Sequence, residues 1–347
     1  MKIDKIIFSS SELFSPWWNI QAPIWRSMGI EPVCILWGKV ENTDMNPELG
    51  EIIEKEFNPD LFESFQITWS KFYHTSTEPE TTWIIGDMDL VPLQSKYFTD
   101  GISILPDDCY THLAFGEIGR HSPNVLRAIA RQANDRELTY LNMFDRRGGF
   151  YDGGMDIPAY YHVAKGKTFS IALGLKDKSF DEQVKWVTES KKFGLGPLHD
   201  NCFHHPPWDT AKHLYQAKGP SAIPIPEEEL YIWVADEGYS SHRIFSAHKE
   251  GKITFISHRN PIMTCLEDVW PTPNRLDRGR IYHDINGDLC YINDLSVLND
   301  LGDEGFNRLQ TPSTYNNYLD VHCFRPFKDQ EKGLHLLLSE FWPNVHV

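Results

Sequence analysis

The chain has 347 residues, and its content of 41% hydrophobic and 13% aromatic residues excludes an intrinsically disordered protein. Lysine and arginine number 33 against 49 aspartates and glutamates, so the formal net charge of −16 argues against nucleic acid and anionic membranes as partners. The six cysteines form no C-x-x-C pair, and no apolar run approaches the roughly 18 residues of a membrane span. We therefore expect reduced thiols, no membrane span and a soluble, cytoplasmic protein.

The first hundred residues predict alternating strands and helices. Short apolar runs bounded by turn residues are typical of buried strands, and amphipathic stretches are typical of helices. By these criteria we expect strands at 5–10, 32–38 and 82–89 and helices at 18–28, 47–57 and 62–74. Gly29 follows the first of these helices, in the position where a glycine commonly ends one. The alternation indicates an α/β protein with an open sheet, and its strand–helix–strand start implies a parallel pair with a right-handed crossover.

The pattern loosens beyond residue 105. Ser179 and Glu182 form a capping-box pattern ahead of a predicted helix that Gly194 ends. We further expect a strand at 229–238, a helix at 332–342, and loops at 146–161, 204–209 and 219–229. Because no polar linker is long enough to separate two domains, we expect one large domain with insertions.

Two aspartates, Asp87 and Asp89, stand at the end of the predicted strand 82–89. On a strand, residues i and i+2 share a face, so both carboxylates would point one way and Met88 the other, into the core. Ligands bind at the carboxyl ends of strands in open α/β sheets, and Mg²⁺ or Mn²⁺ commonly bridges carboxylates there to a nucleotide diphosphate. The alternative interpretation is a plain turn, because aspartate favours strand ends and Pro92 enforces a bend.

The strand–helix–strand start, the helix before residue 81 and the apolar run into "GDMDLVPL" (86–93) together resemble the GT-A glycosyltransferase fold. That fold is α/β, a Rossmann-like open mixed sheet flanked by helices, here with acceptor-side insertions. The resemblance implies a metal-dependent glycosyltransferase that moves a sugar from a nucleoside-diphosphate sugar, such as a UDP- or GDP-sugar, to a glycan or other hydroxyl acceptor. It also implies that Asp87 and Asp89 hold Mn²⁺ or Mg²⁺, and that Asp87 helps to bind the donor's diphosphate.

The same resemblance assigns a role to each part of a single domain spanning 1–347. Residues 1–105 would form the nucleotide-sugar-binding half, and residues 106–347 the acceptor-binding and C-terminal half. Ser9 and Ser10, at the end of the first predicted strand, lie where this fold contacts the nucleoside.

Four residues of the second half complete the implied site. Asp236 and Glu237 follow an apolar run, as does the acidic pair that faces the acceptor hydroxyl in many GT-A enzymes; in inverting members one acid is the general base. His322, after a predicted strand, stands where such enzymes often supply a third metal ligand, and Arg325 would neutralise diphosphate charge. Each has an ordinary interpretation too: acids after a strand form a solvated turn, and a lone histidine is packed structurally.

Two other functions fit part of the pattern. A nucleotidyltransferase acting on sugar phosphates also uses paired aspartates and a cation, but it usually carries a glycine-rich basic loop after the first strand, and residues 9–18 contain none. A non-catalytic carbohydrate-binding protein of the same fold is the second alternative, and the intact acids and histidine of the motifs argue against it.

Overall fold

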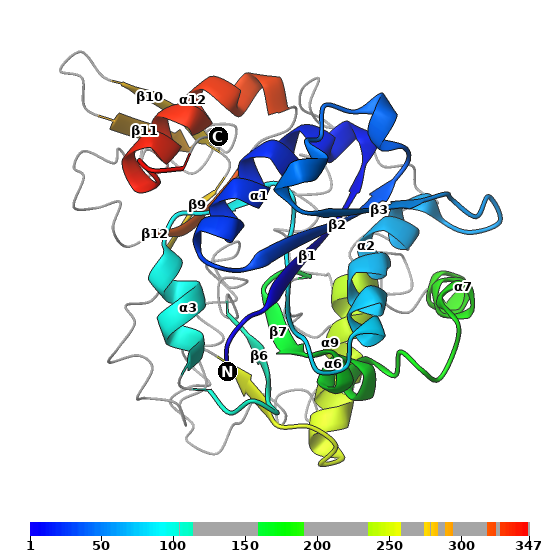
Figure 1. Cartoon of the computed structure of the whole chain (residues 1–347). Helices are drawn as coiled ribbons and strands as arrows, with labels where there is room; N and C mark the ends of the chain where they lie inside the picture. The colour runs from blue at the N-terminus through cyan, green and yellow to red at the C-terminus, as the bar shows by residue number, and fades with distance from the viewer. Residues whose placement is uncertain are drawn as a thin grey trace, which may run out of the picture. The chain divides into compact units, whose positions relative to one another are not determined.

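The computed structural model describes residues 1–103, 105–113, 159–190, 235–257, 274–277, 279–283, 289–293, 318–323 and 327–345 (Figure 1). Strands and helices alternate along the chain, so the predicted α/β class is confirmed. The chain divides into two compact units that interleave in sequence. The first unit contains Met1–Glu56, Thr82–Asp107 and Ile262–Val347, and the second contains Phe57–Thr81 and Asp108–Pro261.

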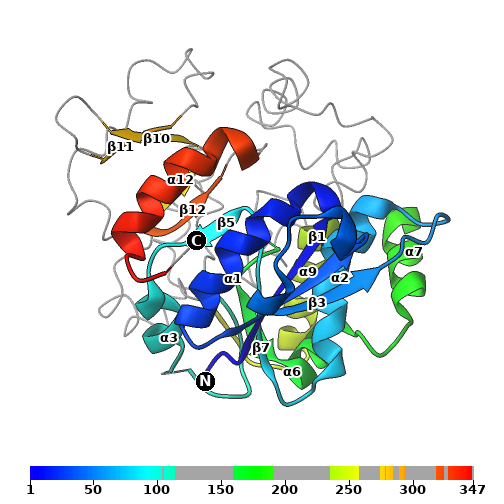
Figure 2. The ribbon, with the colours of Figure 1, turned by 45° about the horizontal axis from the view of Figure 1, so that its top comes forward.

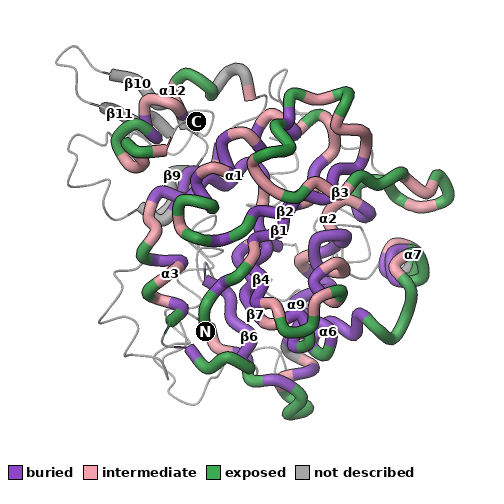
Figure 3. Tube along the Cα trace, in the orientation of Figure 1, coloured by how far each residue is buried: buried purple, intermediate pink, exposed green. Residues whose placement is uncertain are grey.

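Four parallel strands, hydrogen-bonded in the order β3-β2-β1-β4, form the centre of the first unit. The strands are β1 (Lys5–Ser11), β2 (Glu31–Trp37), β3 (Glu51–Lys55) and β4 (Thr82–Ile85). β1 and β2 are buried over most of their length, as Figure 3 shows in purple. Strands of parallel sheets are covered on both faces, which explains why these two read as continuous apolar runs.

The predicted strand–helix–strand unit is confirmed, with β1 and β2 parallel and a helix between them. A 3₁₀ helix, η1 (Glu12–Trp17), leads into α1 (Trp18–Ser27), which packs on β2. Gly29 follows with φ +75°, the left-handed conformation that glycine adopts without steric cost, and its N–H donates to the Arg26 carbonyl. The predicted end of this helix is therefore also confirmed.

The helix expected at 47–57 is wrong. The segment forms a short 3₁₀ helix, η3 (Pro47–Leu49), followed by the edge strand β3. Gly50 separates them, and a side chain there would collide with the Pro32 carbonyl. The glutamates and lysine of β3 favour a helix in isolation, but Ile52 and Ile53 pair in register with Cys34 and Ile35 of β2, and this ladder overrides local propensity.

A second, three-stranded sheet in the first unit has the order β5-β12-β9. Figure 2 shows its neighbouring strands β5 and β12 side by side. Its strands are β5 (Leu90–Pro92), β12 (Tyr318–His322) and β9 (Asn274–Asp277), with β12 antiparallel to β5 and parallel to β9. The predicted strand before His322 and the predicted C-terminal helix, α12 (Phe327–Phe341), are both confirmed. Trp342, just past this helix, donates its indole N–H to the Pro92 carbonyl at 2.8 Å.

Three further elements complete the described part of the first unit. They are α3 (Ser95–Ser103), the 3₁₀ turn η2 (Val40–Asn42), and the hairpin of β10 (Gly279–His283) with β11 (Leu289–Asn293). α12 contacts both this hairpin and η1, where the rings of Trp17 and Phe327 meet edge to face at 4.7 Å.

Among its described residues, the second unit contains four helices and three strands. The helices are α2 (Glu63–His74), α6 (Gly166–Leu173), α7 (Phe180–Ser190) and α9 (Ala235–Lys249), with the 3₁₀ turn η4 (Thr75–Thr77) after α2. The strands are β6 (Tyr110–His112), β7 (His162–Lys165) and β8 (Phe255–Ser257), in the order β7-β6-β8. Trp69 is fully buried at the centre, in ring contact with Phe65, Phe72 and Tyr239.

The capping box predicted for the helix after residue 179 is confirmed in α7. The Ser179 N–H and hydroxyl donate to the Glu182 carboxylate at 2.8 and 2.7 Å, and the Glu182 N–H returns a bond to the Ser179 hydroxyl at 3.3 Å. Gly194, the predicted end of this helix, lies outside the described residues, as do the loops at 204–209 and 219–229 and most of that at 146–161. Across the described part of the chain, no helix has the length and apolarity needed to cross a membrane.

Candidate functional site

The two aspartates of the D-x-D motif lie on a turn and not on a strand face. β4 ends at Ile85, and the Leu90 N–H donates to the Asp87 carbonyl at 3.2 Å, so the expectation of a strand running through Asp89 is wrong. Gly86 begins the bend, with its N–H bonded to the Ile7 carbonyl at 2.8 Å and no room for a Cβ against the Phe8 ring. The chain therefore leaves the sheet one residue before the first aspartate.

This turn, residues 87–90, still carries its carboxylates at the carboxyl end of the parallel sheet. Met88 is buried, as expected, Asp87 is half-buried, and Asp89 is only 4% exposed. A buried carboxylate is costly unless a cation or hydrogen-bond donors accompany it. Asp89 is therefore the acid of the pair for which a positive partner matters most.

His322 reaches the turn through the pairing of β12 with β5. His322 lies opposite Leu90 in the antiparallel register, and the Cys323 N–H donates to the Asp89 carbonyl at 2.8 Å. This register places the His322 Nε2 atom 3.6 Å from the Asp89 Oδ2 atom. The structure thus brings together two residues that the sequence places far apart.

The surroundings of this pair are strongly acidic. Asp320 precedes His322 by two residues, which places both on one face of β12, and it is fully buried. Burial raises the pKa of the Cys323 thiol well above its usual range, and the negative charges of Asp89 and Asp320 raise it further. The thiol therefore stays protonated at neutral pH, so the carboxylates and the imidazole are the side chains here that can bind a cation.

The spacing of Asp89 and His322 suits a divalent cation. Two ligands that each lie roughly 2.1 Å from one ion can be at most roughly 4.2 Å apart, so the 3.6 Å between Asp89 and His322 fits a shared ion. Among the described residues, no group of three histidine, cysteine or acidic side chains is close enough to hold an ion. A partly built donor set suits Mg²⁺ or Mn²⁺, because such ions commonly take one or two carboxylates and complete their shell with water and substrate phosphates.

Ser9 and Ser10 lie at the same edge of the sheet, in the last part of β1. Ile7 is paired with Ile85 of β4, so the two serines extend just beyond the end of that strand. Ser10 is 1% exposed and its hydroxyl donates to the Ser11 carbonyl at 2.7 Å, whereas Ser9 is half-buried. Ser9 is thus the more accessible of the two.

Glu12 is a polar residue of this edge that the motifs did not single out. Its Oε1 atom accepts from the Asn42 side chain at 2.9 Å and from the Lys39 N–H at 3.0 Å, and these bonds lower the pKa of its carboxyl. The carboxylate thereby holds the loop that follows β2 against the loop that follows β1. In the sequence, the only signal for this role of Glu12 is its position directly after the first strand. Nothing in the local sequence shows that its carboxylate contacts Asn42.

Asp236 and Glu237 belong to the second unit, whereas the D-x-D turn belongs to the first. Residues 229–234 of the predicted strand lie outside the described residues. From Ala235 the chain is helical, so the two acids stand in the first turn of α9 and not on a strand. Asp236 is 7% exposed, and the Glu237 Oε1 atom accepts from the Ala159 N–H at 3.3 Å. Acids in a first helical turn interact favourably with the helix dipole.

Arg325 lies outside the described residues.

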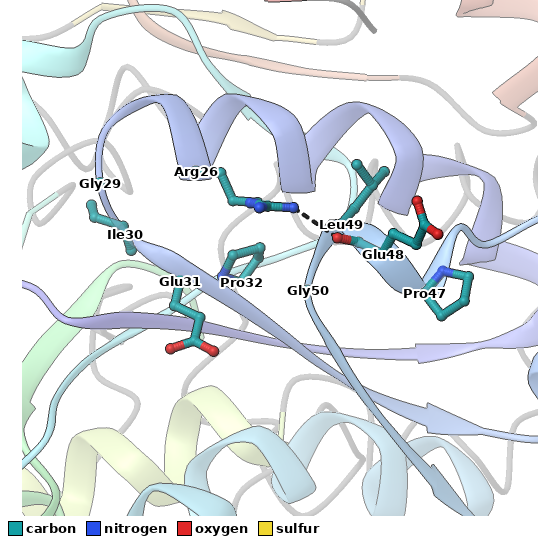
Figure 4. Close-up of a pocket in the computed structure, with 9 residues that line it drawn as sticks. All are labelled: Arg26, Gly29, Ile30, Glu31, Pro32, Pro47, Glu48, Leu49 and Gly50. Atoms are coloured by element: carbon teal, nitrogen blue, oxygen red, sulfur yellow. Dashed lines mark hydrogen bonds between the residues drawn. The ribbon is translucent and has the colours of Figure 1, made fainter.

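The first unit also has a shallow groove, lined by Arg26, Gly29, Ile30, Glu31, Pro32, Pro47, Glu48, Leu49 and Gly50 (Figure 4). Arg26 spans it and donates to the Glu48 carbonyl at 2.7 Å. The groove lies where β2 and β3 begin, at the end of the parallel sheet opposite the D-x-D turn, and so is separate from the candidate site.

Comparison with known proteins gives no family: no protein-family model matches the chain, and no curated protein or solved structure matches it either.

Proposed function

We propose that this protein is a metal-dependent glycosyltransferase that transfers a sugar from a nucleoside-diphosphate sugar to a hydroxyl group of a glycan. One observation carries the proposal: His322, on β12, pairs with Asp89, on the D-x-D turn at the carboxyl end of β4. This is the edge of an open α/β sheet where ligands bind, and its donor set suits a cation that arrives with a diphosphate. The loop after β1 supports this over a nucleotidyltransferase, because it forms a 3₁₀ helix without a glycine-rich basic segment.

In this proposal the carboxylates of Asp87 and Asp89 and the imidazole of His322 would hold Mn²⁺ or Mg²⁺. The bound ion would supply positive charge where the leaving nucleoside diphosphate becomes more negative. Ser9 and its neighbour Ser10 would line the nucleoside side of the site, and Arg325 would contribute further positive charge. These residues bind and orient the donor.

Asp236 and Glu237 are the candidate residues for the acceptor. Asp236 or Glu237 would orient the acceptor hydroxyl and, in an inverting enzyme, remove its proton as the sugar is transferred. Both acids stay candidates, for an inverting or a retaining reaction alike, because in a retaining enzyme they would only orient the acceptor.

Calorimetric titration with UDP and GDP, in Mn²⁺ and in excess EDTA, tests the donor side. We expect chelation to weaken nucleoside diphosphate binding at least tenfold, about 1.4 kcal/mol. Equal affinity in EDTA would contradict the role of the D-x-D turn. A screen of nucleotide sugars for slow hydrolysis then identifies the donor, and release of pyrophosphate instead of nucleoside diphosphate would favour a nucleotidyltransferase.

A further inference from the structure

Gln21, on α1, is bonded to the backbone of the D-x-D turn. Its side chain is fully buried, and its Nε2 atom donates to the Leu90 carbonyl at 2.6 Å and to the Met88 carbonyl at 3.1 Å. The Asp87 carbonyl lies within 3.4 Å of the same nitrogen. One amide group therefore reaches three of the four carbonyls of the turn.

The orientation of this amide is fixed by Trp25, one helical turn further along α1. The Trp25 indole N–H bonds to the Gln21 Oε1 atom at 3.0 Å. Because an indole nitrogen only donates, the amide oxygen must face Trp25 and the amide nitrogen must face the turn. Trp25 is itself fully buried and meets the Phe98 ring edge to face at 4.8 Å, so the whole arrangement is held by the core.

All four carbonyls of the turn have protein donors. The Asp87 carbonyl accepts from the Leu90 N–H, the Asp89 carbonyl accepts from the Cys323 N–H, and the other two accept from Gln21. The backbone of the turn is therefore bonded into the protein through all four of its carbonyls. Without Gln21, two carbonyls would lose their donor, and a buried carbonyl without one favours another backbone conformation.

We infer that Gln21 is a positioning residue, which holds the turn at 87–90 in the conformation that presents Asp87 and Asp89 to the cation. This inference rests on the proposed function as far as the cation is concerned. The restraint on the backbone is a separate property and can be measured without a metal.

The chain offers a matched control in Gln183, on α7 of the second unit. Gln183 is 1% exposed, its Oε1 atom accepts from the Trp69 indole N–H at 3.0 Å, and its Nε2 atom donates to the carbonyls of Leu175 and Lys178 at 3.1 Å each. The two glutamines thus share burial, an indole donor and carbonyl acceptors. They differ in which loop they hold, and only Gln21 holds the D-x-D turn.

The test compares Gln21→Met and Gln183→Met, which keep side-chain length and remove the amide, with the wild-type protein. Mn²⁺ affinity is measured by electron paramagnetic resonance, and backbone exchange at residues 86–92 by hydrogen–deuterium exchange without metal. We expect Gln21→Met to weaken Mn²⁺ binding at least tenfold and to speed exchange in the turn at least tenfold. Gln183→Met should lower the melting temperature by a similar amount and leave both quantities at wild-type values.

The outcomes separate this inference from the proposed function. If the wild-type protein binds Mn²⁺ and Gln21→Met binds it equally well, the inference is overturned and the proposed function stands. If the wild-type protein binds no Mn²⁺, the proposed function fails, and unchanged exchange in the turn would overturn the positioning role too. Should Gln21→Met fail to fold, Gln21→Glu, which keeps the acceptor for Trp25 and loses the NH₂ donors, is subjected to the same two measurements.

Discussion

Asp89 combines burial with a position against both His322 and the backbone of Cys323. We expect Asp89→Asn to weaken Mn²⁺ binding at least tenfold, about 1.4 kcal/mol, because the amide keeps the shape and removes the charge. The melting temperature should not fall, since the substitution also removes a negative charge from the neighbourhood of Asp320. Metal titration and thermal melting of the same sample check both statements. An unfolded variant would show that the carboxylate has a structural role. A folded variant with wild-type Mn²⁺ affinity would contradict its role as a ligand.

His322 gives a prediction with a spectroscopic signature. If its imidazole binds the ion, pulsed electron paramagnetic resonance of the Mn²⁺-loaded protein should show coupling to a nitrogen nucleus, and His322→Gln should abolish that coupling and weaken Mn²⁺ binding several-fold. The side chain remains 18% exposed, so the variant should fold. A lower melting temperature together with an unchanged Mn²⁺ titration would instead mark His322 as a packed residue that only pairs with Asp89.

Single residues also mark the limit of prediction from sequence. Asp87, Asp89 and His322 stand out because carboxylates and imidazoles are common cation ligands, and ligands bind at the carboxyl ends of strands in open α/β sheets. Gln21 does not stand out, since a lone glutamine in an apolar helix is equally compatible with a surface position. Its role depends on which backbone lies opposite, and that is a property of the folded chain.

Among the helices, α7 allows a direct test of whether its own local sequence, through the Ser179 cap, stabilises its start. Removing the cap with Ser179→Ala should lower the free energy of unfolding by about 1 kcal/mol, measured by denaturant titration at pH 7. A value within error of zero would show that tertiary packing alone holds the start of this helix.

The same cap predicts a pH dependence. The Ser179 hydroxyl and N–H lower the pKa of the Glu182 carboxyl in the folded state. A lowered folded-state pKa gives stability that is present above the unfolded-state value of about 4.3 and is lost as the pH falls through the folded-state value. The stability difference between the wild-type protein and Glu182→Gln should therefore shrink below about pH 4. A difference that stays constant down to pH 3 would contradict this assignment.

Elements that depend on local signals were predictable, and elements that depend on partners were not. α1, α2 and α7 have amphipathic faces or caps that specify them locally. β3 resembles a helix by composition and becomes a strand because β2 offers it a ladder. The strand before the D-x-D turn ends at Ile85, and a side chain at the next residue, Gly86, would collide with the Phe8 ring, a restriction that no local pattern contains.

For the molecule as a whole, ligand binding should register in thermal stability. A ligand that binds only the folded state at one hundred times its dissociation constant stabilises it by about 2.7 kcal/mol. We expect UDP or GDP to raise the melting temperature when Mn²⁺ is present, and to have little effect with EDTA. A chain carrying a net charge of −16 repels a free diphosphate, which the cation offsets. An equal shift with and without the metal would contradict the proposal.

The division into two compact units was not visible in the sequence. The first unit takes three separate stretches of the chain and the second takes two, so neither unit corresponds to one contiguous segment. Domains that follow one another along a chain are often separated by a polar linker, which can be recognised in the sequence. Units that interleave in the chain need no such linker. The order of motifs along the chain therefore says little about which of them share a unit.

The pairing of β5 with β12 also has a consequence for biosynthesis. The ribosome makes the D-x-D turn and β5 first, and the strand that supplies His322 and the Cys323 N–H emerges much later. Contacts between residues so distant in sequence form late, because the intervening polypeptide must first be confined. A nascent chain would therefore carry the two aspartates long before it could complete the proposed cation site. Until β12 has been made, the turn would lack both the imidazole and the backbone N–H that this strand brings to it.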